Sequence, residues 1–493
     1  MNAPSVLVVD VGTSSVRATV VDASGAFLAH AARPLALCSP VPGAAEQDAE
    51  DWWSATAGAL AEVAPYSAGV SALTVTNQQI STVAVDRSGA PLAPAMLWMD
   101  QRANEILDAM PAPVRHKVCA ITGSPVSSSW SIARPLWWRD REPRVFANAD
   151  AFLTADAFVY SRLAGRRVTD PSNACFSLMN IHTDSYDRGL GVEVGVDVSL
   201  LPEVAPSGSA IGALGPRVAQ RLGLPAGLPI VASGSDQPCA ALGMGVVRAD
   251  QVAVTTGTGT FVVRPVATPV TDFRFVLNRG VGDLRYVLMG MHYVSGAAWN
   301  WFVDHVDVAC SGRGELSQQL LQEVWERESG RRAPLLAPYF SGARSPHFDD
   351  GAQATWTGLT LCTSRADMAY SVLESNGFGV RQIVDAMDDV CGEPASVVRL
   401  AGGPAVSPQW CQLQADASGL RSERASSAEA STLGAAMVVL VGLGVHASAA
   451  EASIACAASF ESFVPNPQTE TAFAARRMAY EDLYERMKGA HVV

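Results

Sequence analysis

Lysine is nearly absent from this chain of 493 residues. Lys117 and Lys488 are its only two lysines among 35 basic residues, and neither lies in a glycine-rich loop. A Walker A loop needs a lysine beside the phosphates, so that route to nucleotide binding is excluded. A nucleotide would have to be held by backbone N–H groups, hydroxyl groups and a metal ion.

An excess of positive charge is also missing, and so is a long apolar segment. The net charge is −13, which argues against nucleic acid and anionic membranes as partners, since both need a basic face. The longest apolar run, near Leu433 to Val445, is shorter than the ~18 residues of a spanning helix. The first five residues carry no Lys or Arg, so we expect no signal peptide.

Paired cysteine motifs are absent as well. The nine cysteines are odd in number and scattered, and no C-x-x-C pair occurs. This usage predicts reduced thiols, most of them buried, in a cytoplasmic protein.

The composition that is present describes a soluble, globular protein. The apolar fraction is 48% and the charged fraction 17%. This length predicts two domains of roughly 240 residues each. We place the boundary after the small-residue segment CAALGMG, which gives domains at 1–245 and 246–493. Apolar or small residues at helical spacing predict helices at 46–63, 364–390 and 429–443.

Two strand-and-turn motifs share a pattern. Residues 5–22, SVLVVDVGTSSVRATVVD, predict a β-hairpin in which Asp10 ends the first strand and Gly12, Thr13 and Ser14 form the turn. Residues 252–260, VAVTTGTGT, repeat the device, with Gly257 and Thr258 in the turn. Backbone N–H groups and hydroxyls in such turns can bind phosphate, and a carboxylate at a strand end can bind Mg²⁺. An ordinary polar turn is the alternative for the first motif.

One such device near the start of each predicted half suggests a duplication. Two homologous domains with a phosphate-binding hairpin each resemble the actin-like, ribonuclease H-like ATPase superfamily. The resemblance implies an α/β fold with two ribonuclease H-like domains facing each other across a cleft.

A candidate general base follows the apolar run Ile230 to Ala232. That run breaks into small residues and leads to Asp236, with Gln237 beside it. A carboxylate within hydrogen-bond reach can accept the proton of an attacking hydroxyl group.

Polar side chains cluster at two further strand ends. Residues 70–86 predict two paired strands around a polar turn that contains Gln78 and Gln79. The segment PAMLWMDQRA at 94–103 offers Trp98 as a flat wall and Asp100 as a hydrogen-bond partner for a polyol. A structural ion pair with Arg102 is the alternative for Asp100.

The order of eight motifs resembles the FGGY family of carbohydrate kinases over roughly residues 5 to 445. The motifs are EQDAEDWW, TNQQISTVAVD, PAMLWMDQRA, TDPSNACFSLMNI, GSDQPCAALGMGVV, TTGTGT, APYFSGARSPHFD and LAGGPAVSPQWCQLQADASGL. The resemblance implies that ATP and Mg²⁺ are used to phosphorylate a sugar or polyol. Within the family the chain looks most similar to xylulokinases.

The resemblance also assigns roles to residues. Asp236 is implied to be the general base and Asp10 the acid linked to the metal ion, with both as Mg²⁺ ligands. Gly12, Thr13, Ser14, Gly257 and Thr258 are implied at the phosphates. The residues implied on the adenosine side are Gly402, Gly403 and Ser407. The residues implied on the substrate side are Gln78, Gln79, Trp98, Asp100 and Gln237.

The predicted sugar-facing turn departs from both best-known patterns. Xylulokinases usually carry Met-His-Gly where this chain has Gln79, Ile80 and Ser81. Glycerol kinases carry Arg-Glu at the first two of these positions. A ketopentose such as xylulose is our expected substrate, with another polyol or small hydroxylated acceptor as an alternative. A sugar-sensing pseudokinase is the non-enzyme alternative. The oligomeric state stays open, with a homodimer as one option.

Overall fold

The computed structural model describes residues 4–292, 295–306, 313–327, 333–349, 351–425, 429–456 and 459–489. The chain packs as two units that are interleaved in sequence. The first comprises 1–247, 265–287 and 429–457, and the second comprises 248–264, 288–428 and 458–493. The domain boundary near residue 245 stays a prediction.

The first unit is built on a six-stranded sheet. Its strand order is β13-β14-β5-β1-β2-β3. Strand β1 pairs antiparallel with β2 and parallel with β5, so it lies in the middle of the sheet. The strands are β1 (Ser5–Val11), β2 (Ser15–Asp22), β3 (Phe27–Pro34), β5 (Val70–Asn77), β13 (Ala210–Ala213) and β14 (Pro229–Val231).

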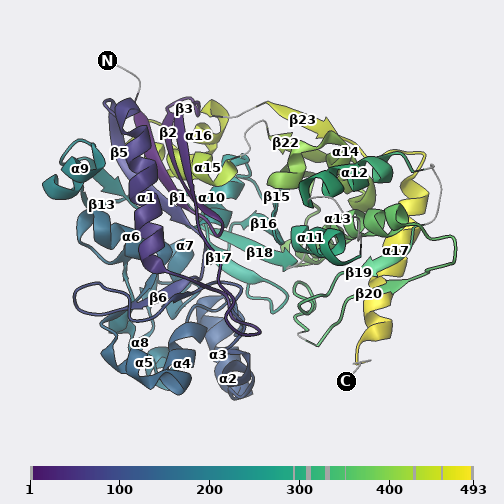
Figure 1. The fold of residues 1–493 in the computed structure, drawn as a ribbon, viewed down its shortest axis with the longest axis horizontal. Helices are drawn as coiled ribbons and strands as arrows, with labels where there is room; N and C mark the ends of the chain where they lie inside the picture. Colours follow the sequence, from purple (N-terminus) through teal and green to yellow (C-terminus); the bar gives the residue numbers. More distant parts are fainter. Residues whose placement is uncertain are drawn as a thin grey trace. The chain divides into compact units, whose positions relative to one another are not determined.

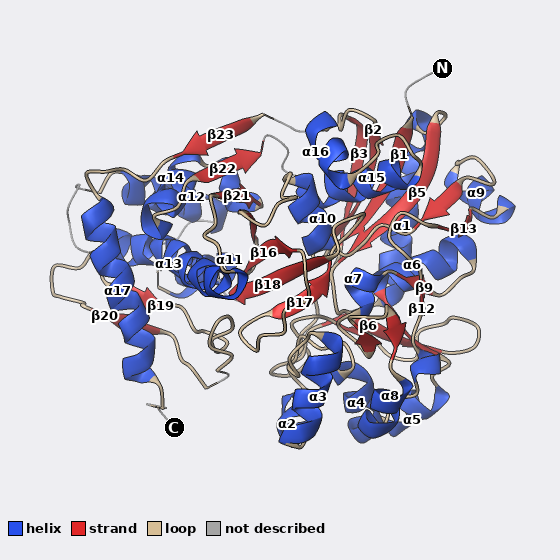
Figure 2. Ribbon diagram, turned by 180° about the vertical axis from the view of Figure 1, so that it is seen from behind, coloured by secondary structure: helices blue, strands red, loops and turns tan. Residues whose placement is uncertain are grey.

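Helices cover both faces of this sheet. The helices of the unit are α1 (Ala49–Val63), α2 (Asn104–Asp108), α3 (Ala112–Thr122), α4 (Ala133–Arg141), α5 (Pro143–Asn148), α6 (Ala155–Ala164), α7 (Pro171–Ala174), α8 (Arg188–Val194), α9 (Pro216–Leu222), α10 (Asp236–Gly243), α15 (Ala430–Gly442) and α16 (Ala449–Ala455). Figures 1 and 2 show α1 over one face and α10, α15 and α16 over the other.

The alternation of side chains along β1 explains why both faces are covered. Leu7, Val9 and Val11 belong to the core with α1 and α6, whereas Val6 and Val8 belong to the core with α10 and α15. Successive residues of a strand point to opposite faces, so a fully apolar strand needs a layer on each side. The hairpin predicted for 5–22 and the helix predicted within 46–63 are confirmed.

A four-stranded sheet accompanies the main sheet of the first unit. Its order is β4-β7-β6-β8, with β4 (Glu46–Gln47), β7 (Ala95–Met96), β6 (Thr82–Val85) and β8 (Ala151–Thr154). The expectation that residues 70–86 form two paired strands is therefore wrong. Strand β5 lies in the main sheet and β6 pairs with β7 and β8, because the chain turns sharply between them at Ile80.

The second unit repeats the strand order of the first. The run β22-β21-β15-β16-β18 corresponds to β14-β5-β1-β2-β3, with β15 antiparallel to β16 and parallel to β21 in the same way. This shared order confirms the duplicated ribonuclease H-like fold. The strands are β15 (Gln251–Thr256), β16 (Thr260–Val266), β18 (Tyr286–His292), β21 (Val397–Ala401), β22 (Ser422–Ala425) and β23 (Phe460–Phe463).

The helices of the second unit include the long segment predicted at 364–390. That segment forms α13 (Arg365–Cys391), which starts with a capping box between Ser364 and Asp367 and ends at Gly392 in the left-handed conformation. The others are α11 (Gly296–His305), α12 (Arg313–Trp325), α14 (Pro408–Ser418) and α17 (Glu470–Met487). Among the described residues, no helix is long and apolar enough to cross a membrane.

Two glycines allow α10 and α15 to cross with their backbones in contact. A Cβ atom on Gly434 would lie 1.8 Å from the carbonyl oxygen of Cys239, and one on Gly243 would lie 2.0 Å from that of Ala430. Real Cβ atoms do not approach backbone this closely, so both positions need glycine. Because α10 begins at Asp236, this crossing fixes the helix that carries the candidate base.

We predict that Gly434→Ala destabilises the protein by about 1–3 kcal/mol, the usual range for overpacking, because the added methyl group must separate the two helices. Thermal or urea unfolding measures the change. Gly69→Ala is the matched control, since a Cβ atom there meets nothing within 4 Å. Equal stability of the two variants would contradict the close crossing.

Candidate active site

The first hairpin turn presents Asp10 at the end of β1. Strand pairing sets Asp10 opposite Arg17, and the Arg17 guanidinium lies 3.4 Å from the Asp10 carboxylate and 3.5 Å from that of Glu429. Burial raises the pKa of Asp10 to about 6, while the charge of Arg17 opposes the rise and that of Glu429 adds to it. Asp10 is therefore a buried acid whose charge calls for a cation.

The side-chain amide of Gln78 holds this turn in place. Its nitrogen donates to the carbonyl of Gly12 (3.2 Å) and to Gln47 Oε1 (3.1 Å). Its oxygen accepts from the hydroxyls of Thr13 (3.1 Å) and Ser81 (3.1 Å). A primary amide has two donors and room for two acceptor bonds, so its capacity is filled by protein groups. This arrangement favours a role in shaping the turn, and a contact of Gln78 with sugar stays a prediction.

A strained turn follows Gln79. The N–H of Ser81 donates to the carbonyl of Gln79 at 2.7 Å, and Ile80 between them has φ of +74°. This is a γ-turn of the rare, positive-φ form, and a β-branched residue seldom adopts such a conformation. Strain of this kind concentrates at functional sites. The Gln79 side chain donates to Ser235 Oγ at 2.6 Å.

Asp236 is the first residue of α10 and lies five residues after Val231, the last residue of β14. The neighbouring Gln237 donates to the carboxylate through its backbone N–H (2.9 Å) and its side chain (3.1 Å). Burial and then the negative charge of Asp10 raise the pKa of Asp236 to about 7. A carboxylate with a pKa near the working pH suits a general base. The buried Oε1 atom of Gln237 has no hydrogen-bond partner within the described protein.

Trp98 joins the two turns of this site. Its indole N–H donates to Thr13 Oγ1 at 3.0 Å, and its backbone N–H donates to Ser81 Oγ at 3.1 Å. Asp10, Thr13, Gln78, Trp98 and Asp236 therefore come from distant parts of the sequence and lie on one connected set of turns in the first unit. The exposed Ser14 contributes its carbonyl to the N–H of Leu35.

Asp100 takes part in the ion pair that was the alternative to sugar binding. Its fully buried carboxylate accepts from the N–H of Ala45 (2.9 Å) and from the guanidinium of Arg102 (2.7 Å). Arg102 also pairs with Glu46 at 2.7 Å. These bonds fasten the segment after β7 to the segment before α1, and a substrate contact of Asp100 stays a prediction.

The second hairpin turn is exposed at Gly257 and Thr258. The N–H groups of Ser295 and Gly296 at the start of α11 donate to the carbonyls of Thr258 and Gly257, both at 3.1 Å. A Cβ atom on Gly296 would lie 2.3 Å from the carbonyl oxygen of Gly257, so glycine allows this contact. The turn is thus fastened to a helix N-terminus through its carbonyls.

The Gly402–Gly403 segment lies beside the second hairpin. Gly402 has φ of +97°, and a Cβ atom there would lie 2.0 Å from the carbonyl oxygen of Thr256. Only glycine fits this close approach. Ser407 caps α14 by accepting from the N–H of Trp410 at 3.2 Å. The nucleotide contacts of Gly402, Gly403 and Ser407 stay predictions.

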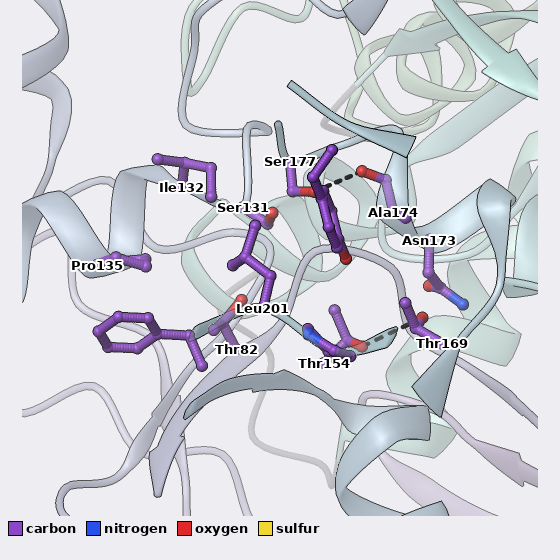
Figure 3. Close-up of a pocket in the computed structure, with 13 residues that line it drawn as sticks. Thr82, Ser131, Ile132, Pro135, Thr154, Thr169, Asn173, Ala174, Ser177 and Leu201 are labelled. Atoms are coloured by element: carbon purple, nitrogen blue, oxygen red, sulfur yellow. Dashed lines mark hydrogen bonds between the residues drawn. The ribbon is translucent and has the colours of Figure 1, made fainter. Parts of the chain in front are cut away.

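A small cavity of about 20 Å³ lies in the first unit and is lined by both polar and apolar residues, among them Thr82, Ile132, Phe152, Asn173 and Leu201 (Figure 3). It has room for about one water molecule and is too small for a sugar. The cavity is therefore not the substrate site.

Several residues of the site were not identified from the sequence. Arg17 could have been found, because the hairpin register places it across from Asp10. Ser172 and Ser235 lie within two of the quoted motifs but were assigned no role, and Glu429 carried no signal of its own. In the second unit, Asn376 in α13 accepts from Thr260 (2.6 Å) beneath the hairpin, and the period of the helix alone gives no reason to expect this.

Comparison with known proteins identifies the family. The N-terminal domain of the FGGY family of carbohydrate kinases matches residues 5–243, and its C-terminal domain matches residues 252–443. The chain belongs to the FGGY family. As a member it is an ATP-dependent carbohydrate kinase, which phosphorylates a hydroxyl group of a sugar or polyol.

Relatives and structural neighbours of this FGGY kinase are named as kinases of glycerol, xylulose and gluconate. A glycerol kinase of Alkalilimnicola ehrlichii is 30% identical over 480 residues, which cover 94% of each chain. A xylulose kinase of Bacillus subtilis is 25% identical over 491 residues, which cover 98% of this chain and 97% of the other. The crystal structure of a ligand-bound xylulose kinase from Lactobacillus acidophilus has a TM-score of 0.89, 21% identity and 99% coverage of both chains.

The raised pKa of Asp236 predicts a pH-dependent gain in stability for Asp236→Asn. The folded pKa of about 7 exceeds the ordinary value of 3.8 for an aspartic acid, so the folded state binds more protons between these two pH values. The contribution of the Asp236 carboxyl to the free energy of unfolding is therefore fully present below pH 3.8 and is lost as the pH rises through 7. We expect the variant to gain at least about 1 kcal/mol over wild type at pH 8, and less at pH 5.

Denaturant unfolding at both pH values tests this prediction. Asp86→Asn is the control with the opposite sign, because hydrogen bonds from Ser88 and Ala90 lower the pKa of Asp86. A stability difference between wild type and Asp236→Asn that does not grow with pH would contradict the raised pKa.

Proposed function

We propose that this FGGY kinase transfers the terminal phosphoryl group of ATP to a hydroxyl group of a neutral ketopentose such as xylulose, with Asp236 as the general base. The observation that carries the proposal is the placement of Asp236. It lies at the start of α10 with a pKa of about 7, next to the turn that bears Asp10. A sugar hydroxyl is a poor nucleophile, and a carboxylate with this pKa can accept its proton as the bond to phosphorus forms.

We infer that the two hairpin turns bind the phosphates. Among the described residues, both lysines lie outside the turns, so the backbone N–H groups around Thr13 and the hydroxyls of Ser14 and Thr258 are the available donors. Donors fixed in this way stabilise developing charge without reorganisation. Gly402, Gly403 and Ser407 are proposed on the adenosine side.

Mg²⁺ fits the donor set of the first turn. Asp10 and Asp236 are acids close enough for the charge of one to raise the pKa of the other, and a cation would offset that repulsion. Mg²⁺ is commonly held by one or two carboxylates together with water and substrate phosphates. When bound, the ion would neutralise phosphate charge, a task for which the chain offers no lysine.

The charges around Asp236 favour a neutral substrate. The charged residue that most affects its pKa is Asp10, which is also acidic. A sugar acid would bring a third negative charge to this place, whereas a ketose or polyol would not. The unpartnered Oε1 atom of Gln237 can accept a hydrogen bond from a substrate hydroxyl, and Trp98 can supply a flat contact.

A polyol such as glycerol is the second candidate. The 30% identity to a glycerol kinase favours it, whereas the sugar-facing turn lacks the Arg-Glu pair of that group.

A substrate panel tests the proposal directly. ADP release is measured with ketopentoses, ketohexoses, polyols and a sugar acid, at matched concentrations. We expect the highest kcat/KM with a ketopentose and no stimulation by the sugar acid. Preference for glycerol would select the second candidate, and preference for the sugar acid would overturn the argument from charge.

Asp236→Asn should keep ATP binding and lose more than ~10²-fold in kcat, because the amide cannot accept the hydroxyl proton. Turnover is measured as sugar-dependent ADP release, and nucleotide binding by calorimetry. Near-normal turnover would remove Asp236 from this role.

Asp10→Asn should raise the Mg²⁺ concentration needed for half-maximal activity, because one of two proposed carboxylate ligands is lost. Titration of activity with Mg²⁺ at saturating sugar measures the shift. Glu62→Gln, at a surface pair with Arg33, is the control for loss of one negative charge. An unchanged Mg²⁺ requirement would exclude Asp10 as a ligand.

A further inference from the structure

Gln79 was expected to contact the sugar, but its side chain is directed to the residue before the proposed base. The amide nitrogen of Gln79 donates to Ser235 Oγ at 2.6 Å, and both side chains are buried. Ser235 immediately precedes Asp236 and is the N-cap residue of α10. The contact therefore joins the predicted sugar-facing turn to the base of the reaction.

Ser235 does not make the hydrogen bond that is usual for an N-cap serine. Such a side chain normally accepts from a backbone N–H in the first helical turn. The Ser235 hydroxyl makes no such cap bond and instead lies 3.0 Å from Ser172 Oγ. The Ser235 N–H donates to the same Ser172 oxygen at 2.9 Å. Ser235 is thus held from outside its own helix, by Gln79 on one side and by Ser172 on the other.

The backbone of Gln79 contacts the base as well. A backbone hydrogen bond from Gln79 to the Asp236 carboxylate lowers the pKa of that acid against the effect of burial. Through its carbonyl, Gln79 also accepts the hydrogen bond of the γ-turn at Ile80, whose conformation is strained and needs support from its surroundings. The amide bond to Ser235 supplies support on the side facing Asp236.

We propose that Gln79 is a positioning residue, which holds Asp236 in its reactive orientation through Ser235 and does not bind the sugar through its side chain. The proposal rests on the general-base role of Asp236. It explains how a chain without Met-His-Gly or Arg-Glu at this turn keeps a working site, since the Gln79 side chain serves the base.

The proposal and the sugar-binding alternative differ in their kinetics. Loss of a positioning contact lowers kcat and kcat/KM together, whereas loss of a contact made equally to bound sugar and transition state raises KM alone.

The experiment is a double-mutant cycle on the full chain. Gln79→Met keeps the length of the side chain and removes the amide, and Ser235→Ala removes its partner. We expect each to lower kcat about tenfold, the effect of one lost hydrogen bond, with little change in the KM for sugar. We expect the double variant to be no slower than the slower single variant, because both changes remove one interaction.

Ser177→Ala is the matched control. It also removes a buried serine hydroxyl, which bonds to the carbonyl of Ala174, outside the contacts of Ser235. Melting temperatures of all variants identify loss of folding. If Gln79→Met does not fold, Ser235→Ala and Ser172→Ala form the replacement cycle, with the same expectation for kcat and KM.

Three results would overturn the proposal: effects of Gln79→Met and Ser235→Ala that multiply, a rise in KM at unchanged kcat, or a Ser235→Ala variant that behaves like Ser177→Ala. Each is distinguishable from failure of the proposed function. In that case Asp236→Asn itself would remain active, whereas here it stays inactive while the cycle fails.

Discussion

The pairing of β1 with β2 on one side and β5 on the other is the constraint on which the first unit depends. The antiparallel pair places the Gly12–Ser14 turn at one edge of the sheet, and the parallel pair brings the end of β5 to the same edge. Strand β14 runs parallel to β5 and leads to α10 there. Carboxyl ends of parallel strands are the usual place for ligands in α/β folds. The Gly12–Ser14 turn, the end of β5 and the start of α10 therefore lie together, although they are far apart in the sequence.

Polar side chains then convert this edge into a defined site. The Gln78 amide joins the Gly12–Ser14 turn to the γ-turn at Ile80. The Gln79 amide joins that γ-turn to Ser235. Buried amides of this kind are costly unless all their groups are paired, so each tie fixes a geometry as well as filling space. The acids Asp10 and Asp236 are left with raised pKa values in the same region. Their repulsion is tolerated because the surrounding strands and helices hold them.

Local patterns predicted the elements well. The hairpin at 5–22, the helices within 46–63, 364–390 and 429–443, and the duplicated hairpin at 252–260 each have a periodic or turn signal in their own residues. The pairing assumed for 70–86 was wrong, because adjacent strands pair only if the turn between them reverses the chain. Positive φ at Ile80 directs the chain into the other sheet instead, and the sequence does not predict positive φ at a β-branched residue. Arg102 could be named as a partner of Asp100, and the hairpin register places Arg17 across from Asp10. The partners of Gln78 depend on tertiary contacts, so only Gln78 itself could be named in advance.

The return of residues 429–457 to the first unit bears on how the protein is made. Helix α15 supplies Leu433, Met437 and Leu440 to the core that also contains Val6 and Val8 of the first strand. On a ribosome these partners are separated by more than four hundred residues of synthesis. The part of the central sheet that α15 covers therefore stays exposed until almost the whole polypeptide has been synthesised. Transiently exposed apolar surface of this kind promotes aggregation, so the order of the chain makes the protein vulnerable during its synthesis.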